Sequence, residues 1–232
     1  MMFVVLVGFG VMTAFFTFFY QETLQEKYTG SMLRSCGRLV VVLKNPHFSI
    51  LLCIFSLAPF AMLAFLAAAS FIYIDGFGFT EQAFSFIFAF NAVCAFVGPT
   101  LYMRLAKNIA IKYIVSGCFF IMACCGLVVL CFGHLSPWLF AITVALATIM
   151  VITMRVPGAH LMLEQQRGDT GSAAALIQFF AMLMGALGMI LGSLSPDHLI
   201  ESLGIIELVA GVLGGALWLM VRNRHFVADH SQ

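Results

Sequence analysis

The sequence predicts an all-α membrane protein with seven transmembrane helices, a prediction based on its composition, its long apolar runs and the placement of its basic residues. Of its 232 residues, 62% are hydrophobic and only 9% are charged, whereas soluble domains carry about 25% charged residues. A chain this apolar cannot cover its surface with polar groups in water, so we do not expect a soluble domain. We do not expect a disordered chain either, because disordered chains are poor in apolar residues. The net charge of +1 gives no basic surface for nucleic acid.

Seven apolar runs are long enough for the roughly 20 residues that a membrane-spanning helix needs. Transmembrane β-strands are about half as long and alternate in polarity, so these runs, which are apolar on all faces, indicate helices. Proline stands at or near three predicted helix starts, and Pro59 inside the second run should kink that helix. We expect the fifth helix to continue to about Leu163. The runs cover 1–20, 48–74, 83–103, 113–133, 137–154, 171–194 and 203–221, and the three prolines near helix starts are Pro46, Pro137 and Pro196.

Basic residues set the expected orientation, because cytoplasmic loops are enriched in lysine and arginine. If the helices alternate in direction, all eleven Lys and Arg residues fall on one side. We therefore expect a multi-pass protein of the cell (inner) membrane with a cytoplasmic C-terminus and an outer N-terminus. The first run has no basic segment before it and no cleavage site after it, so we interpret it as a retained helix. The expected organisation is a helix over 1–20, a cytoplasmic loop over 21–47, a six-helix unit over 48–221 and a cytoplasmic tail over 222–232.

Enzyme motifs are missing from the sequence, which has no phosphate-binding loop, no GxSxG and no HExxH. The seven cysteines include no CxxC pair and no metal-ligand spacing, so we interpret them as buried free thiols. We expect no catalytic residue, no metal site and no cofactor.

Two charged residues fall within or close to apolar runs. Glu207 follows the predicted start of the last helix by four residues, so we interpret it as an interfacial side chain; a functional role is the alternative. We expect Arg155 to extend its head to the inner membrane face, with a role in a cavity as the alternative.

Small and polar residues on helical faces suggest helix contacts and a ligand surface. Gly188 with Gly192, and Gly211 with Gly215, form GxxxG motifs that favour close packing inside the bundle or, alternatively, dimerisation. Phe88 shares a face with Asn91, and Gln178 shares another with Met182. An amide on a Phe- or Met-rich face suits an apolar drug pocket, although either amide could instead bond a neighbouring helix. These four residues are candidate substrate-binding residues.

Five segments, in order, resemble motifs of the Bcr/CflA drug:proton antiporters of the major facilitator superfamily. Gln21 and Ser70 stand where that family often has proline. The segments are Glu-Thr-Leu at 22–24, Phe-Ile-Tyr-Ile-Asp at 71–75, Phe-Ala-Phe-Asn at 88–91, Arg104-Leu105 with Lys107 and Lys112, and Thr-Gly-Ser-Ala-Ala-Ala-Leu at 170–176.

The resemblance implies a partial major facilitator superfamily fold, with the seven helices equivalent to family helices six to twelve. Residues 48–133 and 137–221 would be inverted repeats, and substrate would bind near the midplane, between this unit and a missing N-terminal half. Phe65 and Tyr73 would then line the cavity together with Asn91 and Gln178.

The function implied is multidrug efflux, with antibiotic resistance as its consequence. Small drug-like molecules and protons would be the partners, within the lipid bilayer. We expect this chain alone, a truncated or half transporter, not to complete a transport cycle. The alternative is a seven-helix receptor or sensor. Against it, no lysine lies within a membrane run, and the longest loop joins the first two helices.

Overall fold

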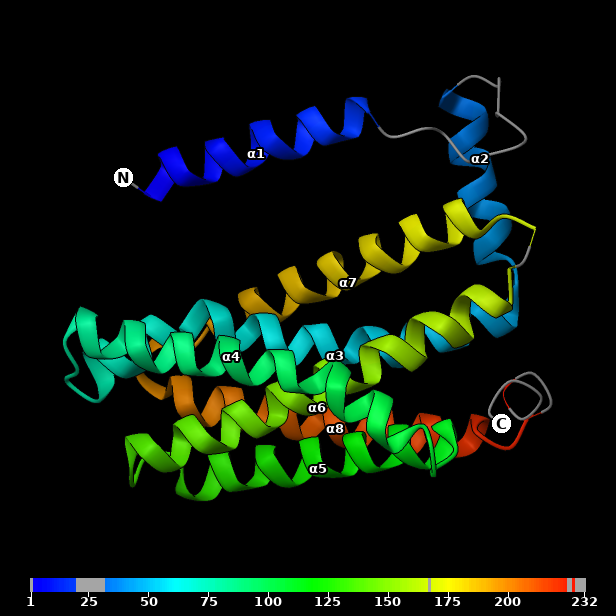
Figure 1. Ribbon diagram of the computed structural model, residues 1–232. Coiled ribbons are helices and arrows are strands. Elements are labelled where there is room, and N and C mark those ends of the chain that lie inside the picture. The colour runs from blue at the N-terminus through cyan, green and yellow to red at the C-terminus, as the bar shows by residue number, and fades with distance from the viewer. Residues whose placement is uncertain (1, 20–31, 167, 225–226, 228–232) are drawn as a thin grey trace. The chain divides into compact units, whose positions relative to one another are not determined.

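The computed structural model describes residues 2–19, 32–166, 168–224 and 227, and every secondary-structure element in these ranges is a helix. Six helices are long and apolar enough to cross a membrane, so the chain is an all-α, multi-pass membrane protein. The elements are α1 (Met2–Phe18), α2 (Met32–Leu43), α3 (Pro46–Ser70), the π-helical turn η1 (Phe71–Gly76), α4 (Glu81–Leu105), α5 (Ile111–Phe132), α6 (Pro137–Glu164), α7 (Thr170–Gly192), the 3₁₀ turn η2 (Pro196–His198) and α8 (Leu199–Val221) (Figure 1).

The chain divides into two compact units, Met1–Cys36 and Gly37–Gln232. The first unit contains α1, an apolar helix of 17 residues. The hydroxyls of Thr13 and Thr17 each donate a 2.8 Å hydrogen bond to the carbonyl four residues earlier, which suits an apolar environment. The seventh membrane span, expected over 1–20, remains a prediction.

The second unit is a bundle of the six long helices, α3 to α8, and its pairing repeats internally. α3 packs against α7 and α8, while α6 packs against α4 and α5; in addition, α5 pairs with α8 and α3 with α6. Exchanging α3 with α6, α4 with α7 and α5 with α8 leaves these six most extensive pairs unchanged, whereas the smaller α6–α7 and α7–α8 contacts have no counterpart of similar extent. Both α3 and α6 also begin at a proline and carry a second proline inside, Pro59 and Pro157. The bundle is therefore built from two similar three-helix groups.

Small residues bring α5 and α8 together (Figure 1). A methyl group added at Gly126 of α5 would lie 2.7 Å from Cα of Leu208, and one added at Gly211 of α8 would lie 2.8 Å from Cα of Ala123. Gly188 likewise meets the backbone of Phe60 where α7 crosses α3. Both GxxxG motifs thus serve packing within the bundle, as one of the two interpretations predicted.

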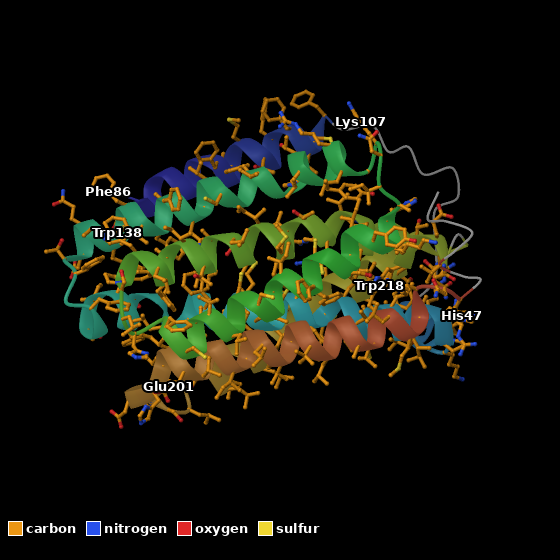
Figure 2. The ribbon with its side chains drawn as sticks, turned by 90° about the horizontal axis from the view of Figure 1, so that it is seen from below. His47, Phe86, Lys107, Trp138, Glu201 and Trp218 are labelled. Atoms are coloured by element: carbon orange, nitrogen blue, oxygen red, sulfur yellow. The ribbon has the colours of Figure 1, made fainter. Side chains whose placement is uncertain are left out.

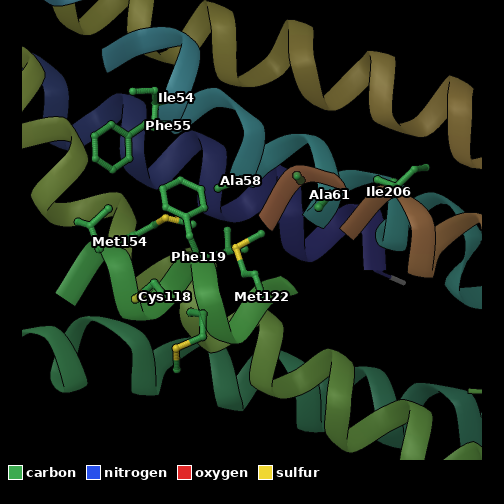
Figure 3. Close-up of a cluster of buried hydrophobic side chains, with 14 of the residues drawn as sticks. Ile54, Phe55, Ala58, Ala61, Cys118, Phe119, Met122, Met154 and Ile206 are labelled. Carbon is green, nitrogen blue, oxygen red and sulfur yellow. The ribbon is translucent and has the colours of Figure 1, made fainter. Parts of the chain in front are cut away.

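The core lies between α3, α5, α6 and α8, whereas α4 and α7 bury few of their side chains. Phe55 of α3, Phe119 of α5 and Met154 of α6 come together in this core (Figure 3). The expectation of buried thiols is correct for Cys118 and Cys125 but wrong for three others, because their helices turn those side chains to the surface of the bundle. These exposed thiols are Cys53, Cys124 and Cys131.

One end of the bundle carries the described Lys and Arg residues of the second unit other than Arg155. Hydrogen bonds from side chains connect the helices at this end. Trp218 Nε1 of α8 donates to the carbonyl of Lys112 at the start of α5, over 3.2 Å. Asn45 Nδ2 donates to the carbonyl of Gln165, which ties the start of α3 to the end of α6 over 3.1 Å. His47 and Lys107 lie at this end and Trp138 and Glu201 at the other (Figure 2).

Helix boundaries differ from the predicted ones where polar residues extend an apolar run. The fifth predicted helix does continue, as α6, to Glu164. The segment 21–47 was expected to be a loop, but its described part contains α2, because apolar residues recur there at helical spacing among basic ones. Residues 20–31 and most of the tail over 222–232 lie outside the described residues. Proline begins α3, α6 and η2 as predicted, and Pro59 lies inside α3.

Candidate functional site

A cavity of about 290 Å³ lies between α3, α6 and α7. All three helices are long and apolar enough to span a membrane. Its walls are mostly apolar and include four methionines. Two polar side chains face it together, because Arg155 Nη2 of α6 donates a 3.2 Å hydrogen bond to Oε1 of Gln178 on α7. The methionines are Met62, Met154, Met162 and Met182.

The two polar residues match in depth. Arg155 lies nine residues before the end of α6, or about 13 Å along the axis. Gln178 lies eight residues after the start of α7, or about 12 Å from the same end of the bundle. Both side chains are exposed on the bundle. A charge that faces hydrocarbon at this depth is costly. The cavity therefore opens toward water or toward other protein groups and not toward lipid.

Arg155 retains free binding capacity. A guanidinium group has five N–H donors, and the described residues supply only the Gln178 oxygen as a hydrogen-bond acceptor. Among those same residues no carboxylate forms an ion pair with it; the described pairs are Arg38 with Asp169 and His198 with Glu201, each over 3.4 Å. The cavity therefore presents one uncompensated positive charge and unused donors to whatever occupies it.

Local sequence fixes the helices around the cavity. Pro157 lacks an N–H and so leaves a carbonyl of α6 without its helical hydrogen bond next to Arg155. The hydroxyl of Thr153 bonds the Ile149 carbonyl over 2.7 Å and the Gly98 carbonyl of α4 over 3.2 Å. At Gly158 an added methyl group would meet the ring of Phe55 at 2.6 Å, so glycine permits the close approach of α6 to α3.

Two of the six candidate substrate residues, Gln178 and Met182, line this cavity. Phe65 and Tyr73 are instead buried, with 7% and 1% of their surface exposed. The Tyr73 ring packs against aromatic side chains from the loop after η1, from α4 and from α6. Its distances to the ring centres of Phe77, Phe79, Phe84 and Phe140 are 6.2, 6.2, 5.9 and 5.5 Å.

The other two candidates, Phe88 and Asn91, lie on α4 and are not among the residues around the Arg155 cavity. Phe88 is partly exposed and packs on Phe84, with ring centres 5.6 Å apart. Asn91 is partly buried. A role for both in binding remains a prediction.

Arg155 and Glu207 have surroundings that differ from those expected. Arg155 was expected to reach the inner membrane face, but it turns toward Gln178, which offers an acceptor at the same depth. The sequence contains a signal for this pairing, because Arg155 and Gln178 lie at similar distances before and after the loop that joins α6 to α7. Glu207 is eight residues into α8, since that helix begins at Leu199, and it faces a second, small cavity inside the bundle.

A wider hollow of about 550 Å³ opens at the end of the bundle away from the basic residues, and loop residues line much of it. Its polar residues are Asp75, Ser193 and His134 together with three around η2: Asp197, His198 and Glu201. Within the described residues no group of three His, Cys, Asp or Glu side chains could hold a metal ion.

Comparison with known proteins gives no relative for this site, since neither a family model nor a curated protein matches the chain. The function has to be inferred from the site itself.

Proposed function

We propose that this chain is part of a secondary active transporter that exports drugs or other small amphipathic molecules in exchange for protons. The Arg155 cavity forms part of its substrate site. The observation that carries the proposal is the Arg155–Gln178 pair, set in a cavity whose other lining residues are apolar except Ser56, inside a bundle of membrane-spanning length. Ligand sites typically combine apolar walls with a few placed polar groups in this way.

The internal repeat supports the proposal. Secondary transporters are commonly built from repeated helix groups, with the binding site near the repeat interface. Here α3 and α6 are equivalent helices of the two groups, and the cavity lies between them. This arrangement agrees with the major facilitator superfamily motifs in the sequence. It favours a transporter over a seven-helix receptor.

Orientation follows from charge. We assign the basic end of the bundle to the cytoplasm and the end with Asp75, Glu81 and Glu201 to the outside, in the inner membrane of a cell. Arg155 and Gln178 then lie about 12 to 13 Å from the cytoplasmic ends of their helices. A drug would reach them from the cytoplasmic side.

The chemistry of the cavity narrows the substrate class. The free donors of Arg155 favour a ligand with a hydrogen-bond acceptor or a negative charge at one end, and they disfavour a cation there. Methionine side chains adapt to differently shaped apolar groups, so the rest of the ligand can vary. We therefore expect neutral or anionic amphipathic compounds to bind better than cationic ones of the same size.

The experiment measures thermal unfolding of the purified chain in detergent with matched neutral, anionic and cationic amphipathic drugs. Neutral or anionic compounds should raise the unfolding temperature of the native chain and of Arg104→Leu, a control at the exposed end of α4. The increase should disappear in Arg155→Leu. Equal stabilisation of Arg155→Leu, or stabilisation by cationic compounds alone, would reject this cavity as the substrate site.

A further inference from the structure

The second cavity lies between α3, α5, α6 and α8, and Glu207 is the one charged residue that lines it. Glu207 lies eight residues after the start of α8, about 12 Å along the axis from the end opposite the basic residues. Gly126 of α5 packs directly on the backbone at Glu207 and Leu208, and the partly buried Glu207 lines the cavity. An acidic side chain at such a position in a membrane protein is a candidate functional group.

Two polar side chains in this cavity have no partner within the described part of the chain. Glu207 forms no ion pair or hydrogen bond there, and neither does the hydroxyl of Thr148, whose side chain is only 7% exposed. Thr143 and Thr153, on the same helix, do bond backbone carbonyls. The volume, about 20 Å³, exceeds the roughly 10–15 Å³ that one water molecule requires. The cavity therefore has room for one water molecule beside the carboxyl and the hydroxyl.

Among the described residues that line the cavity, no cation offsets the carboxyl charge. The cavity residues of α3 are Ala61, Met62 and Phe65, and those of α6 are Val144, Ala147, Thr148 and Val151, none of which is charged. α7, which also contacts α8, has no titratable side chain. On α5 the thiols of Cys124 and Cys125 directly precede Gly126, which contacts the backbone at Glu207. The neutral carboxylic acid is the form that these surroundings accept at least cost.

We propose that Glu207 and Thr148 form a proton-binding site within the bundle, together with one water molecule. The carboxylate gains an O–H bond when a proton arrives, and its charge goes from −1 to zero. Met62 and Val151 line this cavity and the Arg155 cavity alike. The proton site therefore lies directly behind the wall of the candidate substrate site.

This position suggests how a proton and a substrate would influence each other. Releasing the proton leaves a carboxylate in a space for one water, so ionisation favours an open arrangement of α3, α6 and α8 that admits more water. Such an opening moves Met62 and Val151 and so changes the substrate cavity. This coupling rests on the proposed function, whereas proton binding itself does not.

Infrared difference spectroscopy of the purified full chain in liposomes, between acid and alkaline buffers, tests the site. The native chain and Glu201→Gln should show the carbonyl band of a protonated carboxylic acid in an apolar environment, and Glu207→Gln should lose it. Glu201 is the matched control because it lies on the same helix but is exposed. Thr148→Val should retain the band at a shifted frequency, since the shared water loses a partner.

Several results would overturn the proposal: the band persisting in Glu207→Gln, no band in the native chain at any pH, or no shift in Thr148→Val. The last criterion decides the matter if Glu207→Gln does not yield folded protein. Because the spectra require no transport, failure of the proton site can be distinguished from failure of the proposed function. An intact band without ligand stabilisation at the Arg155 cavity rejects the proposed function alone, and the reverse result rejects the proton site alone.

Discussion

Replacing Gly126 by alanine drives a methyl group into the backbone of α8. The new carbon would lie 2.7 Å from Cα of Leu208 and 2.9 Å from the carbonyl carbon of Glu207, whereas carbon atoms in good contact are about 3.5–4.0 Å apart. Since backbone cannot swing aside as a flexible side chain can, α5 and α8 must separate by about 1 Å. The separation would loosen the interface that holds Glu207.

The expected magnitude follows from two opposing terms. Overpacking of a tight interface costs about 1–3 kcal/mol, and backbone contacts on the new atom place Gly126→Ala near the upper limit. Alanine recovers about 1 kcal/mol of helix propensity over glycine, which leaves a net loss of about 2 kcal/mol. Gly117→Ala is the matched control, because it lies on the same helix with nothing within 4 Å of the added carbon. That variant should gain up to about 1 kcal/mol.

Unfolding of the purified chain in mixed micelles, titrated with a denaturing detergent, measures this difference. The two variants should differ by about 3 kcal/mol, or roughly 100-fold in the unfolding equilibrium constant. Equal stability of Gly126→Ala and Gly117→Ala would show that α5 and α8 do not pack as closely as the structure indicates.

Three further predictions concern ligand range, orientation and the basic end. In a transport-competent context, Gln178→Ala and Asn91→Ala should change which drugs are exported, measured as growth inhibition across a panel, without loss of expression; unchanged profiles in both would make the amides packing groups. On a cysteine-free background, a cysteine replacing Glu81 should react with an impermeant reagent from outside and one replacing Lys107 should not, whereas the reverse pattern would contradict the orientation. Trp218→Phe removes the indole donor to the Lys112 carbonyl, which keeps the Ser116 hydroxyl as a donor, and should lose about 0.5–1.5 kcal/mol in the same unfolding assay; native stability would count against that bond.

The sequence predicts the six long helices well because membrane spans need only length and apolar composition, both of which are local properties. It also predicts that the two GxxxG motifs mediate close packing. α2 was missed because basic residues interrupt the apolar run along its sequence, and membrane-span criteria ignore such short amphipathic helices. The apolarity of the spans likewise hides which face of each points inward, so Cys53 was expected to be buried but is exposed.

The candidate site was predicted only in part, for a related reason. Gln178 and Met182 share a face of one helix, a relation that the sequence contains. The pairing of Gln178 with Arg155 depends on how α6 and α7 pack, and the depth of Glu207 depends on polar residues before the last apolar run, where α8 begins.

Proton exchange on ligand binding tests the central claim most directly. A compound that stabilises the purified chain through Arg155 would be titrated calorimetrically at several pH values and in buffers of different ionisation enthalpy. Antiport requires that proton and drug weaken each other's binding by the same factor. We predict that drug binding releases protons, that its heat depends on the buffer, and that affinity falls as the pH is lowered. Binding with no proton release and no pH dependence would contradict a proton-coupled exporter.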